Sequence, residues 1–216
     1  MKKRMKDKNE RISEVLALAP VVPVLQFDDP DTAVQTSQAL VRGGLPVIEI
    51  TLRTPQALDC ISAVAREVEG AVVGAGTVMT PAMMSDCVAI GCQFLVSPGA
   101  TTELIDANKK VDVPLLPGVA TPSEAMALMA EGYEFLKFFP AEQAGGSNYL
   151  KSLAPVLQGL KFCPTGGLTA EKAPQYLALD NVICVGGSWV APKDLIAAQD
   201  WDGITALAAT ASALGQ

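Results

Sequence analysis

The sequence predicts an α/β protein, a single (β/α)8 barrel of the TIM type with a short N-terminal helix. Eight short segments are apolar and rich in β-branched residues, which is typical of buried strands. Amphipathic stretches rich in Ala, Leu, Glu and Gln lie between them, and successive strands start 19 to 26 residues apart. This alternation indicates a parallel sheet, and eight such units can close on themselves. A doubly wound open sheet is the alternative that the pattern leaves open.

The predicted strands account for the apolar segments in chain order. They are Val21–Phe27, Val47–Leu52, Ala71–Val78, Phe94–Gly99, Val113–Val119, Phe135–Pro140, Leu160–Gly167 and Val182–Trp189. No composition shift or linker divides residues 12–216, so we expect one barrel domain over this range.

Helix-start residues precede the stretches between the strands. Thr or Asp as the N-cap, with Pro at the first helical position, is the expected signal. Thr121 also has Glu124 three residues further on, as in a capping box. The other predicted starts are Asp28–Asp31, Thr54-Pro55, Thr80-Pro81, Thr101–Glu103 and Thr169–Glu171.

The first eleven residues form a basic extension ahead of the barrel domain. Residues 1–11 carry six positive and two negative charges, so the remaining body is −11 within a whole-chain net charge of −7. The apolar segment that follows is interrupted by Pro20 and Pro23 and has no small-residue cleavage site. We therefore expect the solvated start of a short helix rather than a targeting segment.

Composition excludes several classes of protein. Of the 216 residues, 50% are hydrophobic and 18% charged, and a mean hydropathy of +0.30 is too high for a disordered chain. No apolar run approaches the roughly 18 residues of a membrane span. The acidic body and an aromatic content of 5% offer nucleic acid little to bind. We expect neither a nucleic acid nor a membrane as a partner.

The chain contains no histidine, and its five cysteines include no C-x-x-C pair. The lack of histidine excludes Ser-His-Asp and Cys-His catalysis and every His-liganded metal site. An odd number of cysteines in apolar contexts indicates buried free thiols in a reducing cytoplasm. Gly74-Ala75-Gly76 lacks the third glycine of a dinucleotide fingerprint. We therefore expect a cytoplasmic protein without a metal or a nucleotide cofactor.

Charged side chains interrupt two of the predicted strands. In the segment 47–53 alternate residues face opposite sides, so Glu49, Thr51 and Arg53 share the face opposite the apolar one and point into the barrel. Lys137 stands alone among apolar neighbours in the segment 135–140, although burying an ammonium group costs several kcal/mol. A structural ion pair between Lys137 and Glu49, or an exposed strand lysine, is the alternative interpretation.

This set of residues points to chemistry on a ketone. A desolvated lysine amine attacks a ketone and forms a Schiff base. A carboxylate across the barrel, Glu49, exchanges protons with the adduct, while Arg53 holds a substrate carboxylate. Thr77 adds a hydroxyl beside this carboxylate site. Lys, Glu and Arg without a metal suit a retro-aldol cleavage.

Glycine pairs end the seventh and eighth predicted strands. They are Gly166-Gly167 and Gly186-Gly187, and Ser188 follows the second pair. Glycine lets backbone N–H groups approach an anion closely, and the N-terminus of a following helix adds its dipole. The loops after strands seven and eight are the common phosphate site of such barrels. The sequence therefore predicts a phosphate-bearing small molecule as the substrate.

Together these motifs resemble the 2-keto-3-deoxy-6-phosphogluconate (KDPG) and 4-hydroxy-2-oxoglutarate (KHG) aldolase family. They follow the family order over residues 12–212, with residues 1–11 outside the resemblance. The matching stretches are Ile48–Arg53, Gly74–Val78, Ser97–Gly99, Leu116–Gly118, Lys137–Glu142, Cys163–Gly167 and Val185–Trp189.

The resemblance implies a metal-independent class I aldolase with a (β/α)8 barrel, assembled as a homotrimer. Its reaction would split 2-dehydro-3-deoxy-6-phospho-D-gluconate into pyruvate and D-glyceraldehyde 3-phosphate, the last step of the Entner–Doudoroff pathway. In this reading Lys137 forms the Schiff base and Glu49 is the general acid and base. Arg53 and Thr77 would hold the substrate carboxylate. The phosphate would bind to Gly166, Gly167, Gly187 and Ser188. Pro98, Phe139 and Thr165 would line the pocket around the imine.

Two other functions remain open at the level of sequence. The same pocket could act on, or prefer, unphosphorylated 4-hydroxy-2-oxoglutarate, which gives pyruvate and glyoxylate, or the galactonate epimer of the phosphorylated substrate. A phospho-sugar-binding barrel without catalysis would keep the glycine pairs. Such a barrel would have no reason to keep Lys137 opposite Glu49.

Overall fold

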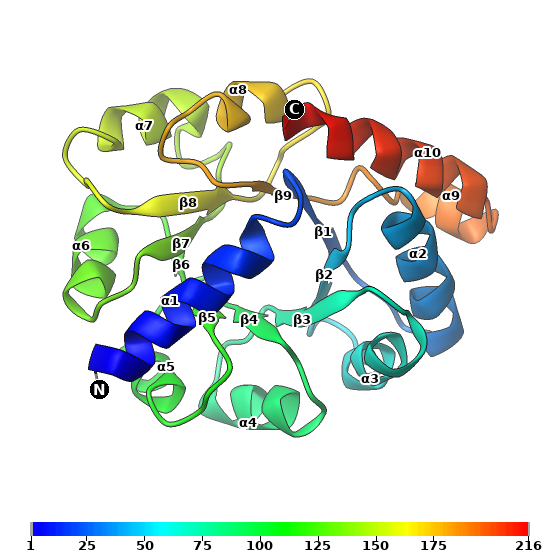
Figure 1. Cartoon of the computed structure of the whole chain (residues 1–216), viewed down its shortest axis with the longest axis horizontal. Helices are drawn as coiled ribbons and strands as arrows, with labels where there is room; N and C mark the ends of the chain where they lie inside the picture. The colour runs from blue at the N-terminus through cyan, green and yellow to red at the C-terminus, as the bar shows by residue number, and fades with distance from the viewer. Residues whose placement is uncertain (1, 216) are drawn as a thin grey trace.

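The computed structural model describes residues 2–215 as an α/β fold in which helices surround a curled parallel sheet (Figure 1). The strands are β1 (Val21–Leu25), β2 (Val47–Thr51), β3 (Val72–Gly76), β4 (Phe94–Val96), β5 (Leu115–Leu116), β6 (Gly118–Val119), β7 (Phe135–Phe138), β8 (Lys161–Pro164) and β9 (Val185–Gly187). The helices are α1 (Lys2–Leu16), α2 (Pro30–Arg42), α3 (Ala57–Glu67), α4 (Pro81–Ala89), α5 (Thr102–Asn108), α6 (Pro122–Ala130), α7 (Gly146–Leu153), α8 (Ala173–Leu177), α9 (Lys193–Ala197) and α10 (Trp201–Ser212), followed by a 3-10 turn over Ala213–Gly215.

Two parallel sheets make up the curled arrangement, with strand orders β5-β4-β3-β2-β1-β9 and β6-β7-β8. A single residue, Pro117, separates β5 from β6, and its carbonyl accepts the Lys137 N–H at 2.9 Å. Isolated parallel bridges connect β8 and the segment after it to the region of β9, pairing Phe162 with Val182 and Thr165 with Gly186. The two sheets therefore contact each other through backbone groups on both sides.

The strand predictions are confirmed in order and position, although the strands are shorter than expected, mostly at their carboxyl ends, and β9 begins at Val185 rather than at Val182. The fifth predicted strand is the exception, because it is divided into β5 and β6 at Pro117. Proline has no N–H to donate to a sheet ladder, so the regular pairing stops there.

Two apolar clusters form the core, on opposite faces of the sheet. The larger one lies between strands and helices and includes Ile48 and Ile50 of β2. The smaller one contains Val47 of β2 together with residues of β1, β4, β5 and β8. Because strands from both sheets meet in the smaller cluster, it fills the concave side. The predicted alternation along β2 is thus confirmed, with the even-numbered residues facing the helices.

Helix α1 covers one end of the concave side, as Figure 1 shows. Ile12 and Leu16 enter the smaller apolar cluster. The side chains of Lys8 and Asn9 are buried, and the Asn9 Nδ2 donates to the Gly132 carbonyl at 2.9 Å. A helix is confirmed here, and most of residues 3–11 are exposed, but the burial of Lys8 and Asn9 corrects the expectation of a solvated start at these two positions. The carbonyls at the carboxyl-terminal ends of α5 and α6 are the hydrogen-bond partners that draw these basic and amide side chains inward.

Four of the predicted helix starts are confirmed as N-caps, and Thr121 with Glu124 forms the predicted capping box. Two starts differ. The Thr54 hydroxyl donates to the Phe27 carbonyl, and α3 begins later. After Thr169 the chain makes a turn first, so α8 begins only at Ala173. Within residues 2–215, no helix has both the length and the apolar character needed to cross a membrane.

Candidate active site

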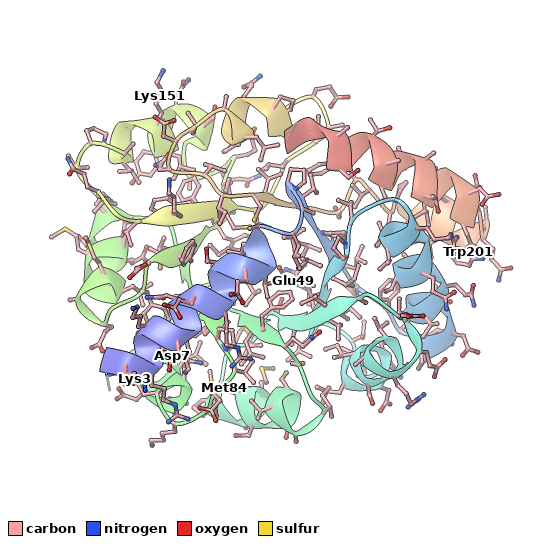
Figure 2. All side chains as sticks on the ribbon, in the orientation of Figure 1. Lys3, Asp7, Glu49, Met84, Lys151 and Trp201 are labelled. Atoms are coloured by element: carbon pink, nitrogen blue, oxygen red, sulfur yellow. The ribbon has the colours of Figure 1, made fainter. Side chains whose placement is uncertain are left out.

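A lysine and a glutamate from distant strands meet on the concave side of the sheet. The Lys137 Nζ on β7 lies 3.3 Å from the Glu49 Oε1 on β2, and both residues are buried, with 4% and 3% of their surface exposed. Figure 2 places Glu49 among the strands, whereas the labelled Lys151 and Trp201 lie on outer helices. The pair predicted from strand alternation is therefore present as a direct hydrogen-bonded ion pair.

Glycine on the neighbouring strand provides the space for the Glu49 carboxylate. Glu49 pairs in register with Gly74, and the next inward-facing residue of β3 is Gly76. A Cβ built on Gly76 would overlap the Glu49 carboxylate, and one on Gly74 would overlap the Phe94 ring. Any larger residue at position 76 would therefore displace the carboxylate from Lys137. No role was predicted for Gly76, although its place on the strand next to that of Glu49 was the available signal.

Arg53 and Thr77 meet at the carboxyl ends of β2 and β3. The Arg53 Nε donates to the Thr77 Oγ1 at 3.2 Å. Arg53 is exposed to solvent. Thr77 has a φ of +61°, a left-handed conformation that is costly for a β-branched residue. This conformation carries the threonine hydroxyl to the guanidinium, so the two residues present one polar surface at the rim.

The two predicted glycine loops line a common cavity of about 160 Å³ together with Arg53. Gly166 and Gly167 have φ values of +107° and +76°, which a residue with a Cβ rarely adopts. The other predicted site residues on this cavity are Phe139, Thr165, Gly187 and Ser188, and Val24, Leu168 and Gly186 complete it. The expected contribution of a helix dipole is wrong, because α8 and α9 begin several residues beyond these loops.

The remaining predicted residues surround Lys137. The Phe139 ring centroid lies 5.3 Å from the Lys137 Nζ, within the range of a cation–π contact. Pro98 is half-buried, and its carbonyl packs against Gly118, the register partner of Lys137. Lys161 lies at the amino end of β8, away from the glycine loop at its carboxyl end; it is exposed, and its ammonium group binds the Asp180 carbonyl. Lys137 is thus the buried strand lysine at this site.

Glu142 braces the loop that carries Gly166 and Gly167. Its Oε1 accepts the Tyr176 hydroxyl at 2.5 Å and its Oε2 pairs with Lys172, which ties the β7–α7 loop to the start of α8. The Glu142 N–H also donates to the Gly166 carbonyl at 3.2 Å. Lys172 and then Tyr176 hold the pKa of Glu142 below its usual value. Glu142 ends the family-like stretch Lys137–Glu142, but no role was predicted for it.

The arrangement suits addition of an amine to the carbonyl group of an anionic molecule. A buried amine and a carboxylate lie side by side, which supplies a nucleophile and a proton carrier at one point. Backbone N–H groups of two glycine loops and the Arg53 guanidinium line the adjoining cavity, where an anionic group would be stabilised.

Comparisons with known proteins give concordant results. A family model described as KDPG and KHG aldolase matches residues 12–207. The 2-dehydro-3-deoxy-phosphogluconate aldolase of Pseudoalteromonas atlantica is 45% identical over 208 residues, which cover 95% of this chain and 97% of that protein. The KDPG aldolase of Legionella pneumophila, solved with pyruvate captured as a covalent carbinolamine, has a TM-score of 0.90 at 43% identity, covering 93% of this chain and 97% of that chain. The Zymomonas mobilis aldolase with 3-phosphoglycerate has a TM-score of 0.89 at 47% identity, covering 95% and 97%.

Proposed function

The chain belongs to the KDPG and KHG aldolase family, and from this premise we propose that Lys137 carries its catalytic imine. The protein is a lyase, a 2-dehydro-3-deoxy-phosphogluconate aldolase of the Entner–Doudoroff pathway. It cleaves 2-dehydro-3-deoxy-6-phospho-D-gluconate into pyruvate and D-glyceraldehyde 3-phosphate. The residue roles below rest on the contacts of Lys137, Glu49 and the cavity beside them.

Imine formation is the first step. Lys137 first passes a proton to Glu49 across their contact, the resulting amine attacks C2 of the substrate, and the ketone oxygen takes that proton from Glu49 to give a carbinolamine. The adduct nitrogen then gives a proton back to Glu49, and Glu49 passes it to that hydroxyl, which leaves as water. The product is a protonated imine between C2 and Nζ, with Glu49 again a carboxylate. The 3.3 Å contact supports this role for Glu49, because a proton carrier must lie within hydrogen-bond reach of the reacting group.

Carbon–carbon cleavage follows from the charge on the imine nitrogen. The Glu49 carboxylate takes the proton of the C4 hydroxyl, the C4–O bond becomes the aldehyde, and the C3–C4 bond breaks. Its electron pair forms the C2–C3 double bond of an enamine and neutralises the nitrogen. After glyceraldehyde 3-phosphate leaves, Glu49 returns its proton to C3, and water hydrolyses the imine to release pyruvate and free Lys137.

The two anionic ends of the substrate are held at the rim of the site. We assign the carboxylate end to Arg53 and Thr77, which are hydrogen-bonded to each other at 3.2 Å. We assign the phosphate to Gly166, Gly167, Gly187 and Ser188, which line one cavity. Pro98, Phe139 and Thr165 complete the pocket near the imine. Arg53 also lines the cavity of the glycine loops, so it lies within the same polar surface as the phosphate donors.

The electrons of the broken bond are accepted by the protonated imine, so the proposed route uses no metal and no cofactor. Retention of full turnover after treatment with a chelator such as EDTA is the expected result. Loss of turnover that a divalent cation restores would contradict this part of the proposal.

The proposal extends to the architecture and the assembly. We propose that the two sheets form one closed (β/α)8 barrel with β5 and β6 as its fifth strand, which the backbone contacts at Pro117 and at Gly186 support. A homotrimer is the proposed assembly, and the exposed Met126 and Met129, three residues apart on α6, offer apolar surface for contacts between subunits. The five cysteines are buried and free, which supports a reducing compartment, the cytoplasm.

A second activity of the same site is the cleavage of 4-hydroxy-2-oxoglutarate to pyruvate and glyoxylate. The family description includes this substrate, and the imine chemistry is identical because it involves only the first four carbon atoms. The glycine loops would have no phosphate to bind, so we expect this activity to be the weaker one. A higher kcat/KM for 4-hydroxy-2-oxoglutarate than for the phosphogluconate substrate would reverse that order. A higher kcat/KM for the phosphogalactonate epimer would make the epimer the preferred phosphorylated substrate.

The contact between Lys137 and Glu49 carries the proposal, and trapping of the imine tests it. The protein is incubated with pyruvate and sodium borohydride, digested, and mapped by mass spectrometry. A reduced pyruvate adduct on Lys137, absent from Lys137→Met, is expected together with complete loss of turnover in that variant. An adduct on Lys161 or on a surface lysine, or none at all, would overturn the mechanism. A binding protein without catalysis would keep its phospho-sugar affinity in Lys137→Met and show no turnover in the wild type.

A further inference from the structure

A second cavity, of about 280 Å³, lies at the end of the sheet opposite the imine site. Its walls come from α1 and from the carboxyl-terminal ends of α5 and α6. These helix ends lead into β5 and β7, so the cavity adjoins the amino ends of strands whose carboxyl ends face the aldolase site. The two cavities share no lining residue. Nothing in the proposed aldolase mechanism uses this second cavity.

Three cations line the cavity, and other bonds fix the position of each. Arg4 donates four hydrogen bonds, two to Asp112 and one each to the Lys109 and Lys110 carbonyls. Lys109 pairs with Asp106 at 2.9 Å and with Glu131 at 2.8 Å. Lys8 donates to both the backbone and the side-chain oxygen of Asn108. An arginine has five N–H donors and a lysine three, so each of these residues retains one donor beyond its bonds.

Of the three cations, Lys8 is the one whose charge no nearby carboxylate in the described part of the chain neutralises. It is 5% exposed, and no carboxylate within residues 2–215 lies within ion-pair distance of its ammonium group. Burial, followed by repulsion from Arg4, lowers the pKa of Lys8 from 10.5 to about 8. A buried ammonium group without a counter-ion is costly, and an anion in the cavity would remove that cost.

We propose that this cavity, which we call the Lys8 cavity, binds the phosphate group of a small phosphorylated metabolite. Three single donors from three separate residues match the three terminal oxygens of a phosphate monoester. A carboxylate has two oxygens and is bound best by a paired arginine fork, but the fork of Arg4 is already occupied by Asp112. Met5 supplies an apolar wall for the organic part of the ligand. Glu131 also lines the cavity, and Lys109 neutralises it.

Protection of the Lys8 amine in the unmodified protein is the first test. The protein is treated with limiting acetic anhydride in the presence and absence of inorganic phosphate, and the acetylation of each lysine is followed by peptide mass spectrometry. At a phosphate concentration of about ten times Kd, Lys8 should react about tenfold more slowly, because roughly one molecule in eleven has a free cavity. Lys110, which is exposed and does not line the cavity, should react at the same rate in both samples.

Calorimetric titration with phosphate is the second test. The Lys8→Met variant should lose one class of phosphate site while its turnover of the aldolase substrate is unchanged. The matched control Lys110→Met removes the same charge two residues beyond Asn108 and should keep that site. Because the aldolase site can bind phosphate on its own, the loss of one class in Lys8→Met is the informative result.

Several outcomes would overturn the proposal. They are an unchanged acetylation rate of Lys8 in phosphate, an isotherm of Lys8→Met identical to that of the wild type, or equal protection by acetate. In those cases Arg4 and Lys8 serve only to cap helix carbonyls, and Lys109 serves only to pair with Asp106 and Glu131. Glycerol phosphate distinguishes the two sources of the ligand. Tighter binding of glycerol phosphate than of inorganic phosphate indicates a metabolite that contacts the apolar wall. Equal binding indicates recognition of the phosphate group alone, so the site would be one for free phosphate and the metabolite assignment would be overturned.

Discussion

At the scale of single residues, the site depends on a lysine that is conspicuous in its own strand. Lys137 lies between apolar neighbours on β7, and its burial is tolerated because Glu49 lies 3.3 Å away. An isolated ammonium group there would be strongly unfavourable. Strand alternation in the sequence predicted which face each residue occupies, but the contact joins positions 88 residues apart. The room for it is made by a third residue, Gly76, that carries no functional group.

Replacement of Gly76 by alanine should therefore disable the proposed proton carrier, Glu49, while residue 49 itself stays unchanged. The added Cβ would overlap the Glu49 carboxylate and move it away from Lys137. We expect kcat to fall by about 10²-fold, within the range that general acid–base catalysis contributes. Steady-state kinetics and circular dichroism of the folded variant check this.

The matched control is Gly99→Ala, because a Cβ at Gly99 meets nothing within 4 Å. Gly99→Ala should keep wild-type kcat. A folded Gly76→Ala variant with wild-type kcat would show that the Glu49 carboxylate can serve from another position, and the role given to Gly76 would be wrong.

At the scale of elements, local sequence signals place most helices and strands, and they fail where another element competes for the same side chain. Thr80, Thr101 and Thr121 cap helices as their sequence context predicts. Thr54 has the same context, but its hydroxyl bonds to the Phe27 carbonyl after β1. No local pattern reveals that competing acceptor, since it lies 27 residues away. The same limit explains why the brace formed by Glu142 was not predicted.

Glu142→Gln should weaken that brace in a pH-dependent way. The pKa of Glu142 lies below its usual 4.5 because Lys172 and Tyr176 stabilise the carboxylate in the folded state. The unfolded chain therefore binds the proton more readily, and the stabilisation is complete above pH 4.5 and lost as the pH falls through the folded value. We expect Glu142→Gln to be about 1 kcal/mol less stable than the wild type at pH 7.

Urea unfolding of both proteins at neutral and at acidic pH measures this difference. The two proteins should converge in stability as the pH falls through the lowered pKa of Glu142, because protonated Glu142 resembles glutamine. Glu124→Gln is a useful comparison, because Glu124 forms a capping box on α6 away from the glycine loops. A constant difference from neutral to acidic pH would mean that shape, rather than charge, accounts for the effect of Glu142→Gln.

At the scale of the whole molecule, the concave side of the sheet is closed at one end by α1 and open to substrate at the other. Ile12 and Leu16 of α1 join strand residues in the smaller apolar cluster. The basic side chains of the same helix bind carbonyls at the ends of α5 and α6. Helix α1 thus joins residues 2–11 of the basic segment, which composition marked as solvated, to the apolar residues Ile12 and Leu16, which contribute to the core. The charges of residues 1–11 predicted a basic surface, and the structure shows that the side chains of Arg4 and Lys8 bind carbonyls at the end of α5.

Leu16→Ala should therefore reduce stability far more than activity. Leu16 is 1% exposed, and its truncation leaves a cavity in the smaller cluster. We expect a loss of about 3 kcal/mol in the free energy of unfolding, with kcat retained under conditions where the variant is folded. Leu18→Ala is the control, because Leu18 is 51% exposed and its truncation should change stability by less than about 0.5 kcal/mol. Equal losses in the two variants would refute the structural role given to α1.

The proposed homotrimer is a prediction about the molecule as a whole. Light scattering on the purified protein should give a mass about three times the chain mass of 22.5 kDa. If α6 lies in the interface, Met126→Glu with Met129→Glu should lower that mass, because charged residues are disfavoured in the core of an interface. A wild-type mass of 22.5 kDa across a wide range of concentration would contradict the trimer.

The sequence by itself determined the order of strands and helices, the face on which the residues of β2 lie, and the lysine, glutamate and glycine-loop residues proposed for the site, although not Gly76 or Glu142. These properties are local, because alternation along a strand and the capping of a helix depend on residues a few positions apart. Only the tertiary structure decided that Lys137 and Glu49 touch, that Gly76 leaves room for the carboxylate, and that α1 turns its lysine and asparagine inward. Those contacts depend on the curvature and register of the sheet, which bring together residues that no short stretch of sequence relates.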